Sequence, residues 1–257
     1  MNDLTISLLQ TNLVWQQPQA NCDHISKALL EHDTKTDLIV LPEMFNSGFT
    51  LDAMKVAETM DGETVNWMQK LSTEHQAAVT GSLVIRENKQ NYNRMVIAFP
   101  DGNLQWYDKK HLFRMAKEQE RYSAGSKRVI INWQGWRIAL YVCYDLRFPV
   151  WCRNQNDTDL MLFVASWPAV RSYPWQTLLK ARAMENLCYV CGVNRIGTDA
   201  NGIEYQGDSG VLDMAGHDIC QLDDRDIIQT VSLSAENLNR FREKFPAHLD
   251  ADSFQVK

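Results

Sequence analysis

The hydrophobic pattern of the chain switches between short apolar runs and longer stretches with apolar residues on one side. Ten runs predict β-strands: residues 4–10, 38–41, 77–84, 93–99, 129–132, 137–143, 160–164, 189–193, 210–214 and 227–231. Five stretches predict helices: residues 18–32, 63–74, 148–154, 174–186 and 235–241. Strands that alternate with helices, and strands that follow one another directly, favour an α/β protein whose sheets are covered by helices.

Turns and breaks in this pattern predict how the elements are connected. The polar residues 87–90 separate two predicted strands and favour a β-hairpin. Ser172 precedes Pro174 at the start of a predicted helix, and we expect it to cap that helix. We expect the weakly periodic tail, residues 245–257, to wrap over a partner subunit or to fray. Since no linker or repeat interrupts the chain, a single domain over residues 1–257 is the simplest organisation.

Composition narrows the class of protein. Hydrophobic residues make up 45% of the 257 residues, which is enough for a full core. The net charge of −6, without a basic stripe, argues against a nucleic-acid partner. The start at Met1 does not resemble a signal peptide, and no apolar run reaches the length of a membrane span. We therefore expect a cytoplasmic protein that does not associate with membranes.

The six cysteines are scattered along the chain, which favours reduced thiols over a disulfide framework. Cys188 and Cys191 form a C-x-x-C pattern, but the pattern lies inside an apolar run and has no second Cys or His pair nearby. A zinc site needs a fuller set of ligands. We therefore expect both cysteines to pack in or beside a core strand, and we expect no metal or other cofactor.

Cys143 stands where a predicted strand ends. The apolar run 138–142 leads into the cysteine, and a polar turn with Asp145, Arg147 and Pro149 follows. The carboxyl ends of strands are where α/β proteins place their chemistry. A thiol at this place attacks an electrophilic carbon when a base and a cation stand nearby, although an isolated cysteine is usually a core residue.

Two other segments supply such a base and such a cation. Glu43 follows a predicted buried strand and has apolar neighbours, which favour its use as a general base. Lys109 and Lys110 lie between aromatic and apolar residues instead of in a polar loop. A buried ammonium group stabilises a developing oxyanion without being consumed.

These three segments, in this order, resemble the signature segments of the nitrilase superfamily. They are Leu-Pro-Glu-Met at 41–44, Tyr-Asp-Lys-Lys-His-Leu-Phe at 107–113, and Cys-Tyr-Asp-Leu-Arg-Phe-Pro at 143–149. The lysine of the family lies two residues before the histidine, and this register selects Lys109, not Lys110. The resemblance extends over about residues 3–245.

The resemblance also implies further features of the site and the fold. A second glutamate is expected ahead of the turn at Gly125, where Glu118 fits best and Glu120 is the competing choice. The backbone N–H of Tyr144 is expected to face the oxyanion together with the lysine. The fold is expected to be a four-layer α-β-β-α sandwich, and the protein a homodimer.

Three further segments, residues 42–49, 165–168 and 181–186, resemble those of the bacterial omega-amidases within this superfamily. The resemblance implies an enzyme that hydrolyses the terminal amide of 2-oxoglutaramate and 2-oxosuccinamate. Such a substrate carries a carboxylate, which a guanidinium binds well. The candidate guanidiniums belong to Arg147 and Arg171, with a structural ion pair to Asp145 or a loop carbonyl as the competing role of Arg147. The candidate aromatic walls of the pocket are Phe45, Tyr144 and Trp167, with simple core packing as the competing role of each.

Three alternatives remain at this stage. A nitrilase or an N-carbamoyl amidohydrolase would use the same Glu43, Lys109 and Cys143, and the shape of the pocket would distinguish it. A Cys–His hydrolase would use His111 as the base, whereas we expect His111 to hold the lysine loop by a hydrogen bond. A non-enzymatic scaffold is disfavoured because all three residue types of the triad are present.

Overall fold

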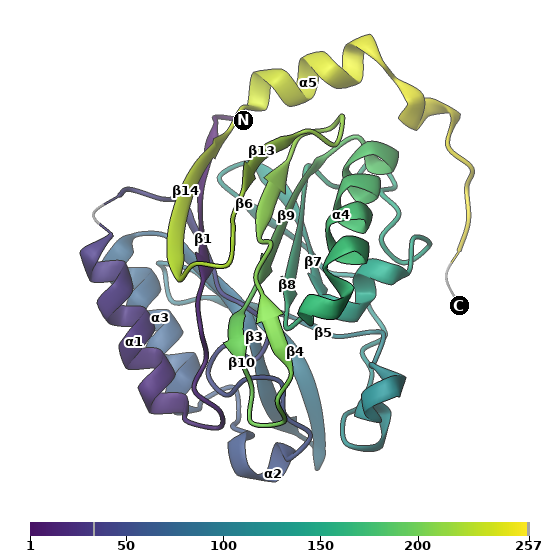
Figure 1. Cartoon of the computed structure of the whole chain (residues 1–257). Coiled ribbons are helices and arrows are strands. Elements are labelled where there is room, and N and C mark those ends of the chain that lie inside the picture. Colours follow the sequence, from purple (N-terminus) through teal and green to yellow (C-terminus); the bar gives the residue numbers. More distant parts are fainter. Residues whose placement is uncertain (33, 256–257) are drawn as a thin grey trace.

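The computed structural model describes residues 1–32 and 34–255, and it contains two six-stranded sheets (Figure 1). The first sheet has the strand order β14 (Ile227–Leu233), β1 (Leu4–Gln10), β2 (Leu38–Val40), β3 (Ala78–Glu87), β4 (Gln90–Ala98) and β5 (Leu104–Asp108). The second has the order β13 (Asp218–Gln221), β12 (Gly210–Leu212), β9 (Tyr189–Asn194), β8 (Leu160–Ala165), β7 (Trp136–Val142) and β6 (Ile130–Trp133). A separate hairpin pairs β10 (Ile196–Thr198) with β11 (Glu204–Gln206).

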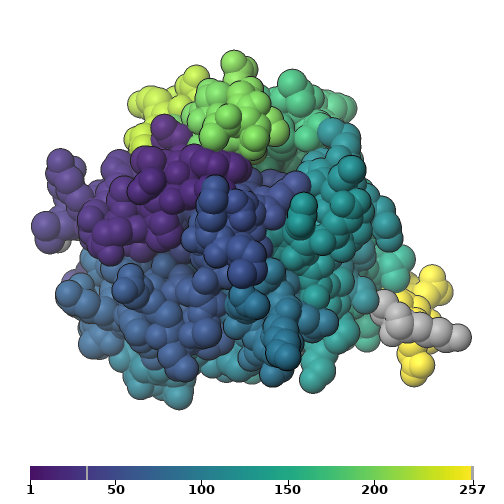
Figure 2. All heavy atoms as spheres, turned by 90° about the horizontal axis from the view of Figure 1, so that it is seen from below, coloured from purple at the N-terminus to yellow at the C-terminus, as the bar shows by residue number. Residues whose placement is uncertain are grey.

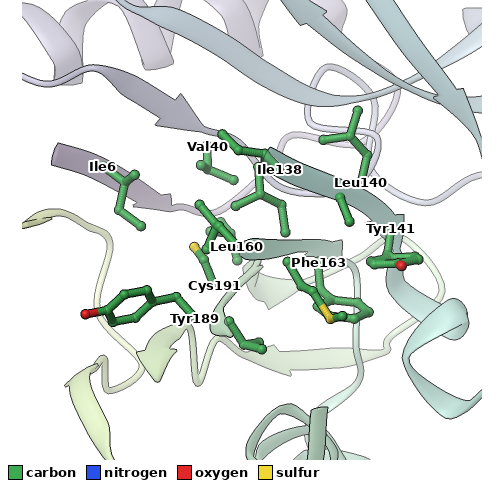
Figure 3. Close-up of a cluster of buried hydrophobic side chains, with 14 of the residues drawn as sticks. Ile6, Val40, Ile138, Leu140, Tyr141, Leu160, Phe163, Tyr189 and Cys191 are labelled. Carbon is green, nitrogen blue, oxygen red and sulfur yellow. The ribbon is translucent and has the colours of Figure 1, made fainter. Parts of the chain in front are cut away.

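Alternating side chains assign the two faces of the first sheet. In β2, Leu38 and Val40 belong to the core between the sheets, together with Ile138 of the second sheet (Figure 3). Ile39 lies on the opposite face, in a cluster with side chains of α1 (Pro18–Glu31) and α3 (Glu63–His75). This alternation follows from the two-residue period of a strand.

The second sheet is covered in the same way by α4 (Ser172–Asn186). A side chain at Gly192 of β9 would meet Leu179 and Trp175 of α4, so this helix packs directly on the strand. Helices therefore lie outside both sheets, and the expected four-layer α-β-β-α sandwich is confirmed. Figure 2, seen from the α2 end of Figure 1, shows purple and blue N-terminal segments packed beside teal segments from the middle of the chain.

Short helices complete the described chain. They are α2 (Ala53–Val56), α5 (Ala235–Lys244) and the 3-10 helices η1 (Arg114–Ala116), η2 (Glu118–Glu120), η3 (Cys143–Arg147), η4 (Ala169–Arg171) and η5 (Ala247–Asp250). Across the described ranges, no helix combines the length and the apolar character that a membrane crossing would need. Residues 256–257 of the tail lie outside the described residues, and its contact with a partner subunit stays a prediction.

Several local predictions can be compared with these elements. The hairpin between β3 and β4 is confirmed, and its two turn residues Asn88 and Lys89 both have positive φ, as a tight hairpin turn requires. The predicted cap is wrong, because Ser172 is the first residue of α4 and its hydroxyl donates to Asp208 instead. Cys188 and Cys191 are buried in the core, as expected.

The helix predicted at residues 148–154 is wrong. The chain forms a single turn there, with the N–H of Cys152 donating to the carbonyl of Phe148. The side chain of Asn154 then accepts hydrogen bonds from the N–H groups of Asp157 and Thr158. Such local bonds from an asparagine side chain compete with helix formation and turn the chain toward β8.

Candidate active site

Loops from both sheets meet at the site. Glu43 follows β2 of the first sheet, and its N–H donates to the carbonyl of Ala165 at the end of β8 in the second sheet, at 3.4 Å. Cys143 follows β7, the parallel neighbour of β8. The carboxyl ends of strands from two sheets thus place the glutamate and the cysteine in one region.

Lys109 lies at the centre of a buried group of charges. Its Nζ donates to Glu43 Oε1 at 2.9 Å and to Glu118 Oε1 and Oε2 at 3.1 and 3.0 Å. The ammonium group also lies 5.5 Å from the ring centre of Phe49. All three charged side chains are almost completely buried. One cation therefore balances two carboxylates in a region that water does not reach freely.

The two oxygens of Glu43 have different partners. Oε1 accepts from Lys109 and, at 2.8 Å, from the amide Nδ2 of Asn93. Oε2 accepts from the backbone N–H of Ser166 at 2.8 Å. Three separate segments thereby hold this carboxylate in one orientation, which is what a general base needs.

Cys143 lines the same cavity as Glu43 and Ser166. Cys143 has φ +46°, an uncommon conformation for a residue with a side chain, and it begins the 3-10 helix η3. The first N–H groups of a helix have no intrahelical acceptor. The N–H of Tyr144, the next residue in the chain, can therefore donate a hydrogen bond to an oxyanion, as its expected role requires.

Burial governs the protonation of these groups. It raises the pKa of Cys143 well above that of a free thiol, the charge of Glu43 acts in the same direction, and Lys109 opposes both. Burial alone would lower the pKa of Lys109, but Glu118 and Glu43 outweigh it and raise this pKa. Burial also raises the pKa of Glu118 despite the opposing charge of Lys109. At rest the cysteine is therefore a thiol, and it needs a base before it attacks.

A second carboxylate, Asp145, organises the loop that carries the lysine. It is buried and accepts from Tyr107 Oη at 2.8 Å and from both the N–H and Nδ1 of His111 at 3.0 and 2.8 Å. The ring of His111 also stacks on Phe148 at 3.7 Å. His111 thus holds the loop by hydrogen bonding, as expected, and does not line the cavity above Cys143.

The choice between the two candidate second glutamates is clear in the structure. Glu118 is buried against Lys109 and also accepts from the N–H of Phe113, whereas Glu120 is exposed. Phe45 is not where we expected it. It packs on the opposite face of the first sheet, with its ring 5.7 Å from that of Trp67, because the turn after Glu43 points its side chain into the cluster under α3.

A cavity of about 230 Å³ opens above these groups. Besides the charged cluster, its lining is mainly apolar and aromatic, from Phe49, Phe113, Met115, Ala116, Tyr144, Trp167, Pro168, Ile203 and Tyr205. Arg147 and Arg171 also line it; their guanidinium groups lie 4.9 Å from the ring centre of Trp167 and 5.5 Å from that of Phe113. Within residues 1–32 and 34–255, neither arginine forms an ion pair with a carboxylate.

Asn93, Phe49 and the Ser166 N–H belong to the site but were not predicted from the sequence. Asn93 could have been found from the sequence, because it is a polar residue at the start of the run 93–99 that predicts a buried strand. Phe49 gave a weaker signal, as the last apolar residue after Glu43. A backbone N–H leaves no trace in the sequence, so the contact of Ser166 with Glu43 could not be predicted.

Comparisons with known proteins place this geometry in a family. The family model for carbon-nitrogen hydrolases matches residues 5–243. The chain belongs to the carbon-nitrogen hydrolase family. It is 48% identical to omega-amidase YafV of Escherichia coli over the full length of both chains, and 30% identical to 2-oxoglutaramate amidase of Bacillus subtilis over 96% of each chain.

Solved structures agree with this membership. A carbon-nitrogen hydrolase superfamily protein from Xanthomonas campestris, with an arsenic adduct in its active site, superposes with a TM-score of 0.98 at 46% identity, covering all of both chains. Yeast Nit3, a nitrilase-superfamily member, has a TM-score of 0.85 at 24% identity over 95% of each chain, and this supports the fold alone. The resemblance inferred from the three motifs is confirmed, and the protein is a carbon-nitrogen hydrolase that acts on amides.

Proposed function

We propose that this protein is an omega-amidase, which releases ammonia from the terminal amide of 2-oxo dicarboxylate monoamides such as 2-oxoglutaramate and 2-oxosuccinamate. The observation that carries the proposal is the buried cluster of Glu43, Lys109 and Glu118, which shares a small cavity with Cys143 and two arginines. The names of the relatives, omega-amidase and 2-oxoglutaramate amidase, support the same substrate class.

The first half of the reaction forms a thioester. Glu43 takes the proton of the Cys143 thiol while Sγ attacks the amide carbon. The negative charge that develops on the amide oxygen is stabilised by Lys109 and the N–H of Tyr144. Glu43 then gives its proton to the amide nitrogen, the C–N bond breaks, and ammonia leaves.

The second half hydrolyses the thioester. Glu43 takes a proton from a water molecule, whose oxygen attacks the thioester carbon, and the same two donors stabilise the oxyanion. The C–S bond breaks, the acid leaves, and Glu43 returns its proton to the sulfur of Cys143. Glu118 holds Lys109 throughout, so that the ammonium stays charged in a buried place.

The charge of the cavity explains the preference for an anionic substrate. Arg147 and Arg171 each lie on an aromatic ring and have no carboxylate partner among the described residues, so a substrate carboxylate supplies a counter-charge. Trp167 and Tyr144 form apolar walls beside them. The α-ammonium of glutamine would be desolvated in the same place without an anionic partner, which is costly.

We also propose that the protein is cytoplasmic, that it forms a homodimer, and that residues 1–257 form one domain. The six cysteines, all among the described residues, are free, which supports a reducing compartment. The span of the family model, residues 5–243, supports a single domain.

The substrate is tested with a panel of amides. Ammonia release from 2-oxoglutaramate, succinamate, glutamine and a short-chain nitrile is measured under the same conditions. We expect kcat/KM for 2-oxoglutaramate to exceed that for glutamine by about a hundred-fold or more, because the unpaired α-ammonium is penalised. A ratio near one, or faster turnover of the nitrile, would contradict the omega-amidase assignment while leaving the triad chemistry in place.

A further inference from the structure

Asn93 is a buried amide in β4 whose side chain contacts both carboxylates of the site. Its Nδ2 donates to Glu43 Oε1 at 2.8 Å and to Glu118 Oε1 at 3.3 Å. Its Oδ1 is buried and has no hydrogen-bond partner among the described residues. A buried acceptor without a partner costs free energy, so this asparagine is not simply optimised for the stability of the fold.

The orientation of this amide is fixed by charge. If Nδ2 and Oδ1 exchanged places, the carbonyl oxygen would face the oxygens of Glu43 and Glu118 and lose both hydrogen bonds. Asn93 is thus held as a donor. Its backbone carbonyl also accepts from the N–H of Lys109 at 3.0 Å, so the same residue contacts every charged member of the cluster.

We propose that Asn93 is a positioning residue that leaves Oε2 of Glu43 as the oxygen that takes the proton from Cys143. Oε1 already accepts from two donors, Lys109 at 2.9 Å and Asn93 at 2.8 Å. Among the described residues, Oε2 accepts only from the N–H of Ser166, so it keeps more lone-pair capacity than Oε1 for a proton. This inference rests on the proposed role of Glu43 as the base.

A neutral donor suits this position better than any charged side chain. Glu43 and Glu118 already share one ammonium, Lys109. The neighbouring ionisable groups include the thiol of Cys143 and the phenols of Tyr122 and Tyr205. A third carboxylate would add like charge to the cluster, and a second cation would compete with Lys109 for the carboxylates. An amide occupies Oε1 without changing the charge of the site.

The first test removes the donor. Asn93→Ala should lower kcat about ten- to a hundred-fold, which is part of the factor that general base catalysis contributes. KM should change by less than about three-fold, because Asn93 does not line the cavity. A variant with the kcat of the wild type would overturn the proposal.

The second test changes the donor to a titratable group of the same shape. In Asn93→Asp, the introduced carboxyl donates to Glu43 only while it is protonated. We expect kcat/KM of this variant to fall on the alkaline side at a pH about one unit or more below the wild-type limit. A variant whose pH limits equal those of the wild type would overturn the proposal, even if Asn93→Ala does not fold.

Asn91→Asp is the matched control, because it makes the same change two positions earlier in the same strand. Among the described residues, the Asn91 side chain forms no hydrogen bond with Glu43, Lys109 or Glu118. It should keep the pH profile of the wild type. The parallel assay of Cys143→Ala separates the two proposals. If Cys143→Ala is active, the thioester mechanism itself is wrong; if it is inactive while both Asn93 variants behave as wild type, only the role of Asn93 is wrong.

Discussion

At the scale of single residues, two adjacent lysines have different environments. Lys109 is buried, and its Nζ is bound by Glu43 and Glu118. Lys110 is half-buried, and its Nζ lies 5.3 Å from the ring centre of Trp151, outside the cavity. One step along the backbone thus separates a cation inside the charged cluster from one at the protein surface.

This difference predicts the effects of two matched substitutions. Lys109→Ala should lower kcat/KM for 2-oxoglutaramate about a hundred-fold or more, because it removes an oxyanion donor and leaves two buried carboxylates without a cation. Lys110→Ala should change kcat/KM by less than about three-fold. Ammonia release measures both. Similar losses from the two variants would show that the lysine register is misassigned.

At this scale the motifs predict the reacting residues but not all of their surroundings. Spacing within 107–113 selected Lys109 because the lysine of the family that this segment resembles lies two residues before the histidine. The prediction that Phe45 lines the pocket was wrong, because the direction of a side chain in an irregular turn depends on backbone angles that spacing does not determine. Asn93 was missed because its partners, Glu43 and Glu118, are distant in sequence.

At the scale of elements, a hydrogen-bonded ion pair with Asp159 holds α5 against the sandwich. The carboxylate of Asp159 accepts from Arg242 of α5 at 2.7 Å and from two side-chain nitrogens of Arg137 at 2.7 and 2.8 Å. Burial of Asp159 would raise its pKa, but the hydrogen bonds from Arg137 and Arg242 outweigh burial and lower it. The ionised form is therefore the one that stabilises the fold.

The sign of this shift predicts a dependence of stability on pH. Because the pKa of Asp159 is lower in the folded state, its contribution is complete above the unfolded value of about 4 and is lost as pH falls through the folded-state value. Asp159→Asn should reduce the free energy of unfolding by about 1–3 kcal/mol at pH 7, and by less below pH 4. Urea unfolding at several pH values measures this.

Asp223→Asn is the control for this prediction. Asp223 also pairs with an arginine, Arg225, and its pKa is also lowered, first by the hydrogen bond from that arginine. Both side chains are exposed, however, so solvent screens the pair. A loss of stability for Asp223→Asn as large as that for Asp159→Asn would contradict the role of burial.

The elements themselves were predicted unevenly. Strongly apolar strands such as β8 and β9 followed directly from the sequence, since burial on both faces leaves a continuous apolar run. The edge strands β5 and β13 and the small hairpin β10–β11 were missed. These strands are short, and their exposed positions mix polar and apolar residues, such as Gln105 and Trp106 in β5. Their hydrophobic pattern is therefore weak, and only their pairing with neighbours defines them.

At the scale of the whole molecule, the site exists because two sheets pack face to face. The glutamate follows a strand of one sheet and the cysteine follows a strand of the other, and the loops meet where Glu43 contacts Ala165 and Ser166. The layer order was predictable from the family resemblance. The distances across the site were not, because they depend on how the two sheets are set against each other.

The central claim is that Cys143 forms the thioester, and one measurement tests it most directly. Ammonia release from 2-oxoglutaramate is measured for the wild type, Cys143→Ala and Cys220→Ala, the last removing another partly exposed thiol. We predict that Cys143→Ala folds as the wild type does but loses roughly 10⁴-fold or more in kcat/KM, whereas Cys220→Ala keeps its activity. A folded Cys143→Ala variant with activity near that of the wild type would contradict the account.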